Sequence, residues 1–204
     1  MLRSNQAQVL TFLSRLDTPK KIQDYLEKLA INFEKRGETC MSPRLVLESR
    51  QAHCMEGALF AAAALLLQGQ KPLVMHTHTT EDDEDHAVAL FRRGGRWGAI
   101  SKTNHPVLRY RDPIYRTYHE LAFSYFHEYF LNNGKKTLVS YSRPFSLKCF
   151  GTSWITSEID LWHIDSAIAN SPHMEFLPNK TKRTELRKAD KLEIKASSLV
   201  SWPP

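Results

Sequence analysis

The chain has 204 residues, a net charge of +6, and 42% hydrophobic and 25% charged residues, which is ordinary for a globular protein with one main domain. The longest apolar or small run, Gly57 to Leu67, is shorter than the roughly 20 residues that a bilayer span requires. No charged segment followed by an apolar stretch opens the chain, so we expect neither a membrane partner nor a secretory signal peptide.

The positive charge and the cysteines narrow the class of protein further. Residues 180–195 hold seven basic and three acidic side chains, and this net of +4 leaves only +2 for the rest of the chain. No aromatic residue is interleaved there, which disfavours a nucleic-acid partner. Cys40, Cys54 and Cys149 are odd in number and far apart, so we expect no disulfide framework and a cytoplasmic location.

The first third of the chain has helical signals. Thr18-Pro19 is a capping hydroxyl followed by proline at the first helical position, and apolar residues then recur at helical spacing until Gly37. Ser42-Pro43 repeats the start signal for a short helix. Residues 54–69 form an almost wholly apolar run of strong helix formers, so we expect a helix buried at the centre of the domain.

After Pro72 the periodicity changes to that of strands. Gly94-Gly95 is a hairpin signal between two of the strand candidates. The predicted elements are strands at 73–78, 85–92, 96–101 and 137–141, an aromatic helix at 118–131 and a helix at 157–169. We expect a single α+β domain over residues 1–172 and a basic, weakly packed tail over residues 173–204.

Cys54 is the residue on which a functional interpretation depends. A thiol at a helix N-terminus is stabilised as the thiolate, because unpaired N–H groups and the helix dipole favour the anion. A free cysteine is also among the most buried residue types and often only fills space. Both readings, a nucleophile and a packed core thiol, fit this position.

His86 follows Cys54 by 32 positions and begins the strand that leads into the hairpin. A cysteine nucleophile needs a base that reaches the sulfur and a third group that holds the ring of that base. A two-residue turn at Gly94-Gly95 pairs positions whose numbers sum to 189, which sets Thr103 opposite His86. Ser101 and Asn104 are the nearby polar candidates for holding the ring.

This order of features resembles the core of the transglutaminase-like proteins, a branch of the papain-like cysteine fold, over residues 42–115. The matching residues are Cys54 in HCMEGALFAAA, His86 in DHAVALFRRGGRWGAIS, and Trp97 in the hairpin. The resemblance implies a central buried helix packed on an antiparallel sheet with additional helices. It also implies a Cys-His-Asp triad that hydrolyses or transfers the acyl group of a peptide, protein or small amide, without a cofactor.

The sequence departs from the family at the acid. The family usually has its carboxylate about four residues after the tryptophan, and here that position is Ser101. We therefore predict Asn104 as the third catalytic residue, since asparagine has this role in papain-like proteases. The family pattern also implies an oxyanion hole built from the N–H of Cys54 and one upstream donor, for which Gln51 is preferred over His53.

Two other functions remain open. In the first, the fold is kept as a non-catalytic binding or interaction module, and Cys54 is a packed thiol. In the second, the protein binds a metal: His76 and His78 flank one strand residue and share a face, and with His86 and the acidic run 81–85 they offer nitrogen and oxygen ligands. A solvated acidic loop between two strands also accounts for that run.

Overall fold

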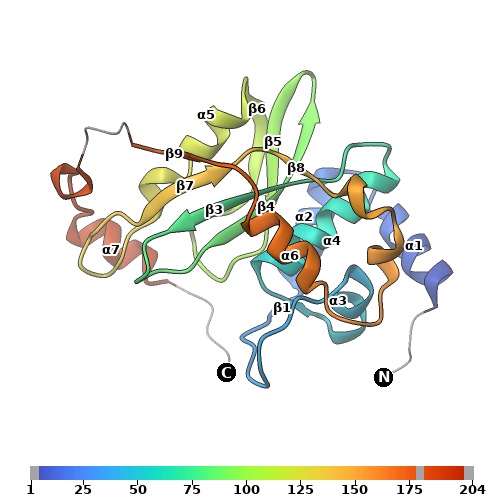
Figure 1. Cartoon of the computed structure of the whole chain (residues 1–204). Helices are drawn as coiled ribbons and strands as arrows, with labels where there is room; N and C mark the ends of the chain where they lie inside the picture. The colour runs from blue at the N-terminus through green and yellow to red at the C-terminus, as the bar shows by residue number, and fades with distance from the viewer. Residues whose placement is uncertain (1–4, 178–181, 200–204) are drawn as a thin grey trace.

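The computed structural model describes residues 5–177 and 182–199. In this part of the chain the fold is α+β, with a seven-stranded antiparallel sheet ordered β6-β5-β4-β3-β7-β9 and a short β8 paired with the start of β3 (Figure 1). The strands of this sheet are β3 (Leu73–Thr79), β4 (His86–Arg93), β5 (Arg96–Ser101), β6 (Arg111–Tyr115), β7 (Leu138–Ser142), β8 (Phe145–Ser146) and β9 (His173–Glu175).

Seven α-helices accompany the sheet in the described residues. They are α1 (Gln6–Arg15), α2 (Pro19–Lys28), α3 (Pro43–Ser49), α4 (Cys54–Leu67), α5 (Tyr118–Phe123), α6 (Trp162–Ala169) and α7 (Lys191–Ser197). A separate two-stranded parallel pair joins β1 (Ala30–Ile31) to β2 (Gln51–Ala52). No helix among the described residues is both long and apolar enough to cross a membrane.

Helix α4 is the centre of the fold, as its composition predicted. Every residue from Met55 to Leu65 is buried, and α1, α2 and α3 lie around the helix (Figure 1). Strand β4 faces α4 with Ala87, Ala89 and Phe91, while Val88 and the other alternate residues belong to a second core with α5 on the opposite face. The small alanine side chains allow the helix to lie close to the sheet.

The hairpin register matches the sequence prediction. The pairs run from Arg93↔Arg96 to Val88↔Ser101, so each pair of numbers sums to 189. Gly94 and Gly95 have φ values of +56° and +76°, the left-handed backbone that a tight hairpin turn of this kind requires at both positions. The register therefore follows from the position of the two glycines.

Tertiary contacts shorten the predicted aromatic helix. We expected it to continue to Leu131, but α5 ends at Phe123 and a 3₁₀ turn follows over Phe126–Glu128. The Arg111 guanidinium binds the Ser124 hydroxyl at 3.0 Å and the Glu128 carboxylate at 2.6 Å. These bonds to a neighbouring strand hold the segment out of a regular helix, which local propensity does not reveal.

The sheet also continues beyond the expected end of the packed domain. We expected the packing to stop at residue 172, yet His173–Glu175 pair with β7 and Phe176 is 4% exposed in the second core. Three residues are too few to show strand periodicity in sequence. The expected basic tail includes residues 178–181 and 200–204, which lie outside the described residues, and α7, which has no buried residue.

The first turn of α4 lies against the end of β5 because position 57 is glycine. A Cβ at Gly57 would be 2.4 Å from Cβ of Lys102, far inside van der Waals contact. We expect Gly57→Ala to lower the free energy of unfolding by about 1–3 kcal/mol, although alanine is the better helix former, because overpacking must displace one element. Urea denaturation of Gly57→Ala beside the parent protein measures this, and a stabilised variant would contradict the close approach.

Candidate active site

The Cys54 thiol is on the first residue of α4. The N–H groups of a first helical turn have no intrahelical acceptor, and the helix dipole adds partial positive charge there, so this end favours an anion. Cys54 is half-buried, and its Sγ lies 4.0 Å from the carbonyl oxygen of Asp85. The thiol therefore stands at the start of a core helix, as predicted, and remains partly accessible.

The His86 ring is held by Ser101 rather than by a carboxylate. His86 is 6% exposed at the start of β4, and its Nε2 is 2.9 Å from Ser101 Oγ. The single hydroxyl proton of Ser101 is donated to the carbonyl oxygen of Leu108 at 2.5 Å. Ser101 Oγ must then accept from Nε2–H of His86, so the unprotonated nitrogen of the neutral ring is Nδ1.

Ser101 is itself fixed by helix α2. The Gln23 side-chain amide accepts from the Ser101 backbone N–H at 3.0 Å and donates to the Ser101 carbonyl oxygen at 2.8 Å. Gln23 is 6% exposed, so the two bonds are formed out of water. The serine that orients the His86 ring is therefore held in place by a residue 78 positions away.

A second histidine adjoins the thiol on the other side. His53 caps α4, and its Nε2 donates to the carbonyl oxygen of Thr39 at 2.9 Å. The same nitrogen lies 3.3 Å from a carboxylate oxygen of the fully buried Glu56. Burial alone would lower the pKa of His53, but its contacts with Cys54 and Glu56 raise it well above the ordinary value. His53 is therefore an imidazolium beside the thiol.

The site does contain a buried carboxylate, that of Glu56, but it lies beside His53 and not beside His86. It accepts hydrogen bonds from Asn32 Nδ2, Thr39 Oγ1 and the backbone N–H groups of Met41 and His53, at distances between 2.8 and 3.2 Å. Burial would raise the pKa of Glu56, but these bonds and the charge of His53 lower it. The buried negative charge is thus balanced by His53.

The two histidines make Cys54 an acidic thiol. Burial raises the pKa of Cys54, but hydrogen bonds with the rings of His53 and His86 outweigh it and hold the pKa at about 6. The ordinary cysteine value is about 8.5, and a group with a pKa near 6 is about nine-tenths ionised at pH 7. By contrast, Cys40 is 1% exposed, and burial and nearby carboxylates raise its pKa.

We expect the alkylation of Cys54 by iodoacetamide to follow this ionisation. In a Cys149→Ala background, which removes the exposed free thiol, the rate should rise with pH through a midpoint near 6 and level off above pH 7. Mass spectrometry of the Cys54 peptide after timed quenching gives the rate at each pH. A midpoint at or above 8.5 would contradict the thiolate.

The other predicted site residues lie nearby. Asn104 is half-buried and three positions past Ser101, beyond the end of β5, and in the described part of the chain no hydrogen bond joins it to His86. The place at Nε2 that we expected Asn104 to take is occupied by Ser101. Gln51 is half-buried in β2, three residues before Cys54, and its role as an oxyanion donor stays a prediction.

A cavity of about 850 Å³ adjoins the site without containing its reactive atoms. It reaches the site through Thr39 and Ser101, the residues that bind the two histidine rings, while neither Cys54 nor His86 lines it. Thr39 and Ser101 therefore separate the cavity from the Cys54 sulfur and the two histidine rings, and we assign no substrate to it.

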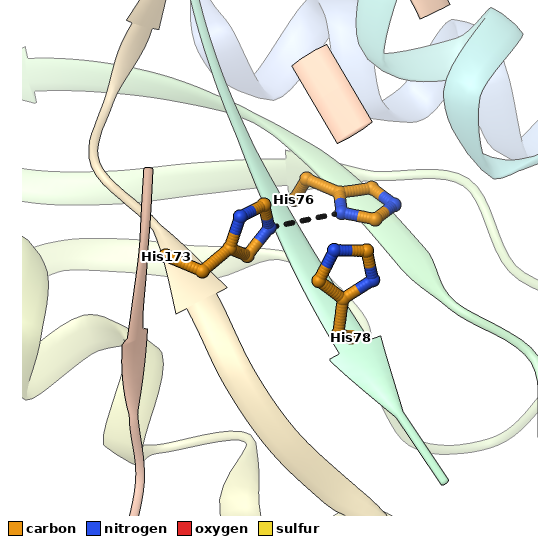
Figure 2. A group of neighbouring side chains, drawn as sticks. All are labelled: His76, His78 and His173. Carbon is orange, nitrogen blue, oxygen red and sulfur yellow. Dashed lines mark hydrogen bonds between the residues drawn. The ribbon is translucent and has the colours of Figure 1, made fainter. Parts of the chain in front are cut away.

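The metal ligands expected from the sequence do not come together as predicted. His76 and His78 do share a face of β3, but His86 turns to the other face with Val88 and bonds Ser101. His173 takes its place: ring nitrogens of His76, His78 and His173 lie within 4.8 Å of one another (Figure 2). Burial lowers the pKa of His76 to about 4, so that ring is neutral.

No protein-family model matches this chain, and no curated protein sequence matches it either.

We preferred Asn104 over Ser101 for holding the His86 ring, and two residues of the site, Glu56 and His173, were not predicted. A signal for Ser101 was present, because it sits two positions from the predicted partner of His86 on the same face of the hairpin. For His173 the sequence offered no signal, since its partner is 97 positions away.

Proposed function

We propose that this protein is a transglutaminase-like cysteine enzyme that hydrolyses an amide or transfers its acyl group through a thioester on Cys54. The observation that carries the proposal is geometric: a half-buried thiol on the first residue of a core helix adjoins His86, whose Nε2 is held by Ser101 at 2.9 Å. The lowering of the Cys54 pKa by the two histidines agrees with this arrangement. Depressed thiol pKa values are a mark of nucleophilic cysteines, whereas inert structural cysteines are buried and protonated.

The residues fit the steps of acyl transfer. The Cys54 thiol passes its proton to Nδ1 of His86, and the resulting thiolate attacks the substrate carbonyl carbon, while the backbone N–H of Cys54 donates to the oxyanion that forms. The protonated His86 ring donates its Nδ1 proton to the leaving amine, and the C–N bond breaks to leave the thioester. His86 then removes a proton from water or an acceptor amine, which attacks the thioester and releases the acid or new amide together with the thiolate.

Among the described residues His86 has no carboxylate partner, and a second positive charge on the other side of the Cys54 sulfur compensates for this. Ser101 orients the His86 ring but cannot neutralise an imidazolium as a carboxylate does. The thiolate–imidazolium pair of Cys54 and His86 is therefore less stable than it would be with a carboxylate beside His86. His53, balanced by the buried Glu56, supplies a second positive charge next to the thiolate. The fold supports the same reading, because a core helix starting at the cysteine packs on an antiparallel sheet whose strand begins at the histidine.

Acylation by an activated ester tests the proposal. With p-nitrophenyl acetate, we expect a burst of one p-nitrophenolate per chain, an added acetyl mass on Cys54, and then continued turnover as water cleaves the thioester. Cys149→Ala should keep both phases, and Cys54→Ala should lose both. A burst with no turnover to water or an added primary amine would indicate a reactive but non-catalytic thiol, and failure to acylate folded protein would leave Cys54 a packing residue.

A further inference from the structure

Three histidines from two strands meet on the face of the sheet opposite to His86. His76 and His78 come from β3 and His173 from β9, with β7 between them (Figure 2). The β7 residue paired with His173 is Ser142, which is fully buried and accepts the backbone N–H of His76 at 2.9 Å. Because its side chain is small, the imidazoles from the strands on either side can meet above it.

The spacing of the ring nitrogens suits a metal ion. His76 Nδ1 and His173 Nε2 are 3.3 Å apart, and one ring nitrogen from each of the three histidines lies within 4.8 Å of the other two. Two nitrogens bound at 2.0–2.1 Å to a tetrahedral zinc ion are about 3.4 Å apart, close to the 3.3 Å between His76 Nδ1 and His173 Nε2. Figure 2 shows the three rings turned toward one common space.

Two of the three remaining ring nitrogens have the hydrogen-bonded outer partners that are typical of metal-binding histidines. His78 Nδ1 is 2.7 Å from the Asp85 carboxylate, and His173 Nδ1 donates to the Ser171 carbonyl oxygen at 2.5 Å. Both bonds place the proton on Nδ1, so each Nε2 has a lone pair that can coordinate a metal. In the metal-free fold the Nε2 lone pair of His173 accepts a hydrogen bond from Nδ1–H of His76 at 3.3 Å, which a metal ion would replace. His76 Nε2 is 3.6 Å from the same Asp85 oxygen, within reach of a small ring rotation that would free Nδ1 as a ligand.

We propose that His76, His78 and His173 form a binding site for a zinc-class divalent metal ion, with Asp85 as the outer carboxylate that orients two of the rings. Three neutral nitrogens and one open position are the ligand set of zinc sites that keep a water molecule. Borderline metals such as Zn²⁺ and Co²⁺ suit imidazole better than the oxygen-preferring Mg²⁺ and Ca²⁺. None of the three histidines has a role in the proposed thiol chemistry, although the carbonyl oxygen of Asp85 lies 4.0 Å from Cys54 Sγ.

Metal titration of the full chain tests the site without reference to activity. After chelation and removal of the chelator, we expect one equivalent of Co²⁺ to bind, with visible absorption bands of a four-coordinate nitrogen and oxygen site, and Zn²⁺ to displace it. His173→Ala and His78→Ala should each weaken Zn²⁺ binding at least 100-fold. Asp85→Asn should weaken it about 10- to 100-fold, as expected for loss of an outer carboxylate.

Controls separate this site from the thiol. His127→Ala removes an exposed histidine outside the cluster and should leave the affinity unchanged, and circular dichroism of each variant verifies the fold. Cys54→Ala should also bind one equivalent with the same absorption bands. Loss of binding in Cys54→Ala with retention in His173→Ala would place the metal at the thiol and overturn the proposal, as would the absence of stoichiometric Co²⁺ or Zn²⁺ binding to the parent protein.

Discussion

Replacement of His86 by alanine is expected to raise the midpoint of Cys54 alkylation toward that of an ordinary thiol and to slow thioester turnover about 10²- to 10⁴-fold. The ring interacts directly with the sulfur, and without it burial acts on the thiol with only His53 to oppose it. Turnover suffers further, because no base remains to activate the water that cleaves the thioester. Alkylation rates against pH and steady-state p-nitrophenolate release measure the two effects separately.

The fold should tolerate this change. In His86→Ala the Ser101 hydroxyl keeps its bond to the Leu108 carbonyl, so only an acceptor lone pair loses its partner. His127→Ala, at an exposed position, is the matched control and should change neither measurement. A His86→Ala protein that folds, alkylates with an unchanged midpoint and turns over at the parent rate would show that the base lies elsewhere.

Glu56→Ala is expected to lower the free energy of unfolding by about 3–5 kcal/mol, the usual cost of removing one partner of a buried charge pair. The carboxylate is fully buried, and Asn32, Thr39, Met41 and His53 would each lose a hydrogen-bond acceptor, while the His53 ring would keep only the more distant carboxylate of Glu34, 3.8 Å from Nε2. Glu56→Gln should also destabilise the fold, because the NH₂ group of the new side-chain amide would face the hydrogen-bond donors that now surround the carboxylate. Urea denaturation at pH 7 measures both, with the exposed Glu81→Ala as control.

The same carboxylate gives stability a dependence on acid pH. The folded-state pKa of Glu56 lies below that of the unfolded chain, so its contribution is complete above the unfolded value of about 4.3 and is lost as the pH falls through the lower folded value. The parent protein should therefore lose more stability on acidification than Glu56→Gln does. Equal pH dependence in the two proteins would show that the pKa of Glu56 is the same in the folded and the unfolded chain.

Helix α4 and the β4–β5 hairpin could be predicted because local sequence patterns specify them. They carry Cys54 and His86, the proposed nucleophile and base. The apolar run beginning at Cys54 could only be a core helix, and the glycine pair at 94 and 95 set the register of the hairpin that carries His86. The partner strand β5 ends at Ser101, as predicted. What the pattern could not decide is which polar side chain binds the ring: it is Ser101, the diagonal neighbour of His86, and not Asn104 beyond the strand.

The rest of the site depends on contacts between distant segments. Asn32, Thr39 and Met41 surround Glu56 from a loop with no repeating pattern, which no periodicity could connect to α4. His173 joins the cluster of His76 and His78 only because a three-residue strand adds to the edge of the sheet. Residues of this kind become visible only when the tertiary fold brings them together.

The two hydrogen bonds between the Gln23 side chain and the Ser101 backbone determine how much of the chain the proposed active site needs. The resemblance to known cysteine enzymes begins at residue 42, yet the backbone of the ring-orienting serine is fastened from α2, which ends at Lys28. A fragment lacking the first two helices would keep the nucleophile, the base and the serine, but would expose the serine backbone to water. Helix α2 is thus part of the proposed active site rather than a separable appendage.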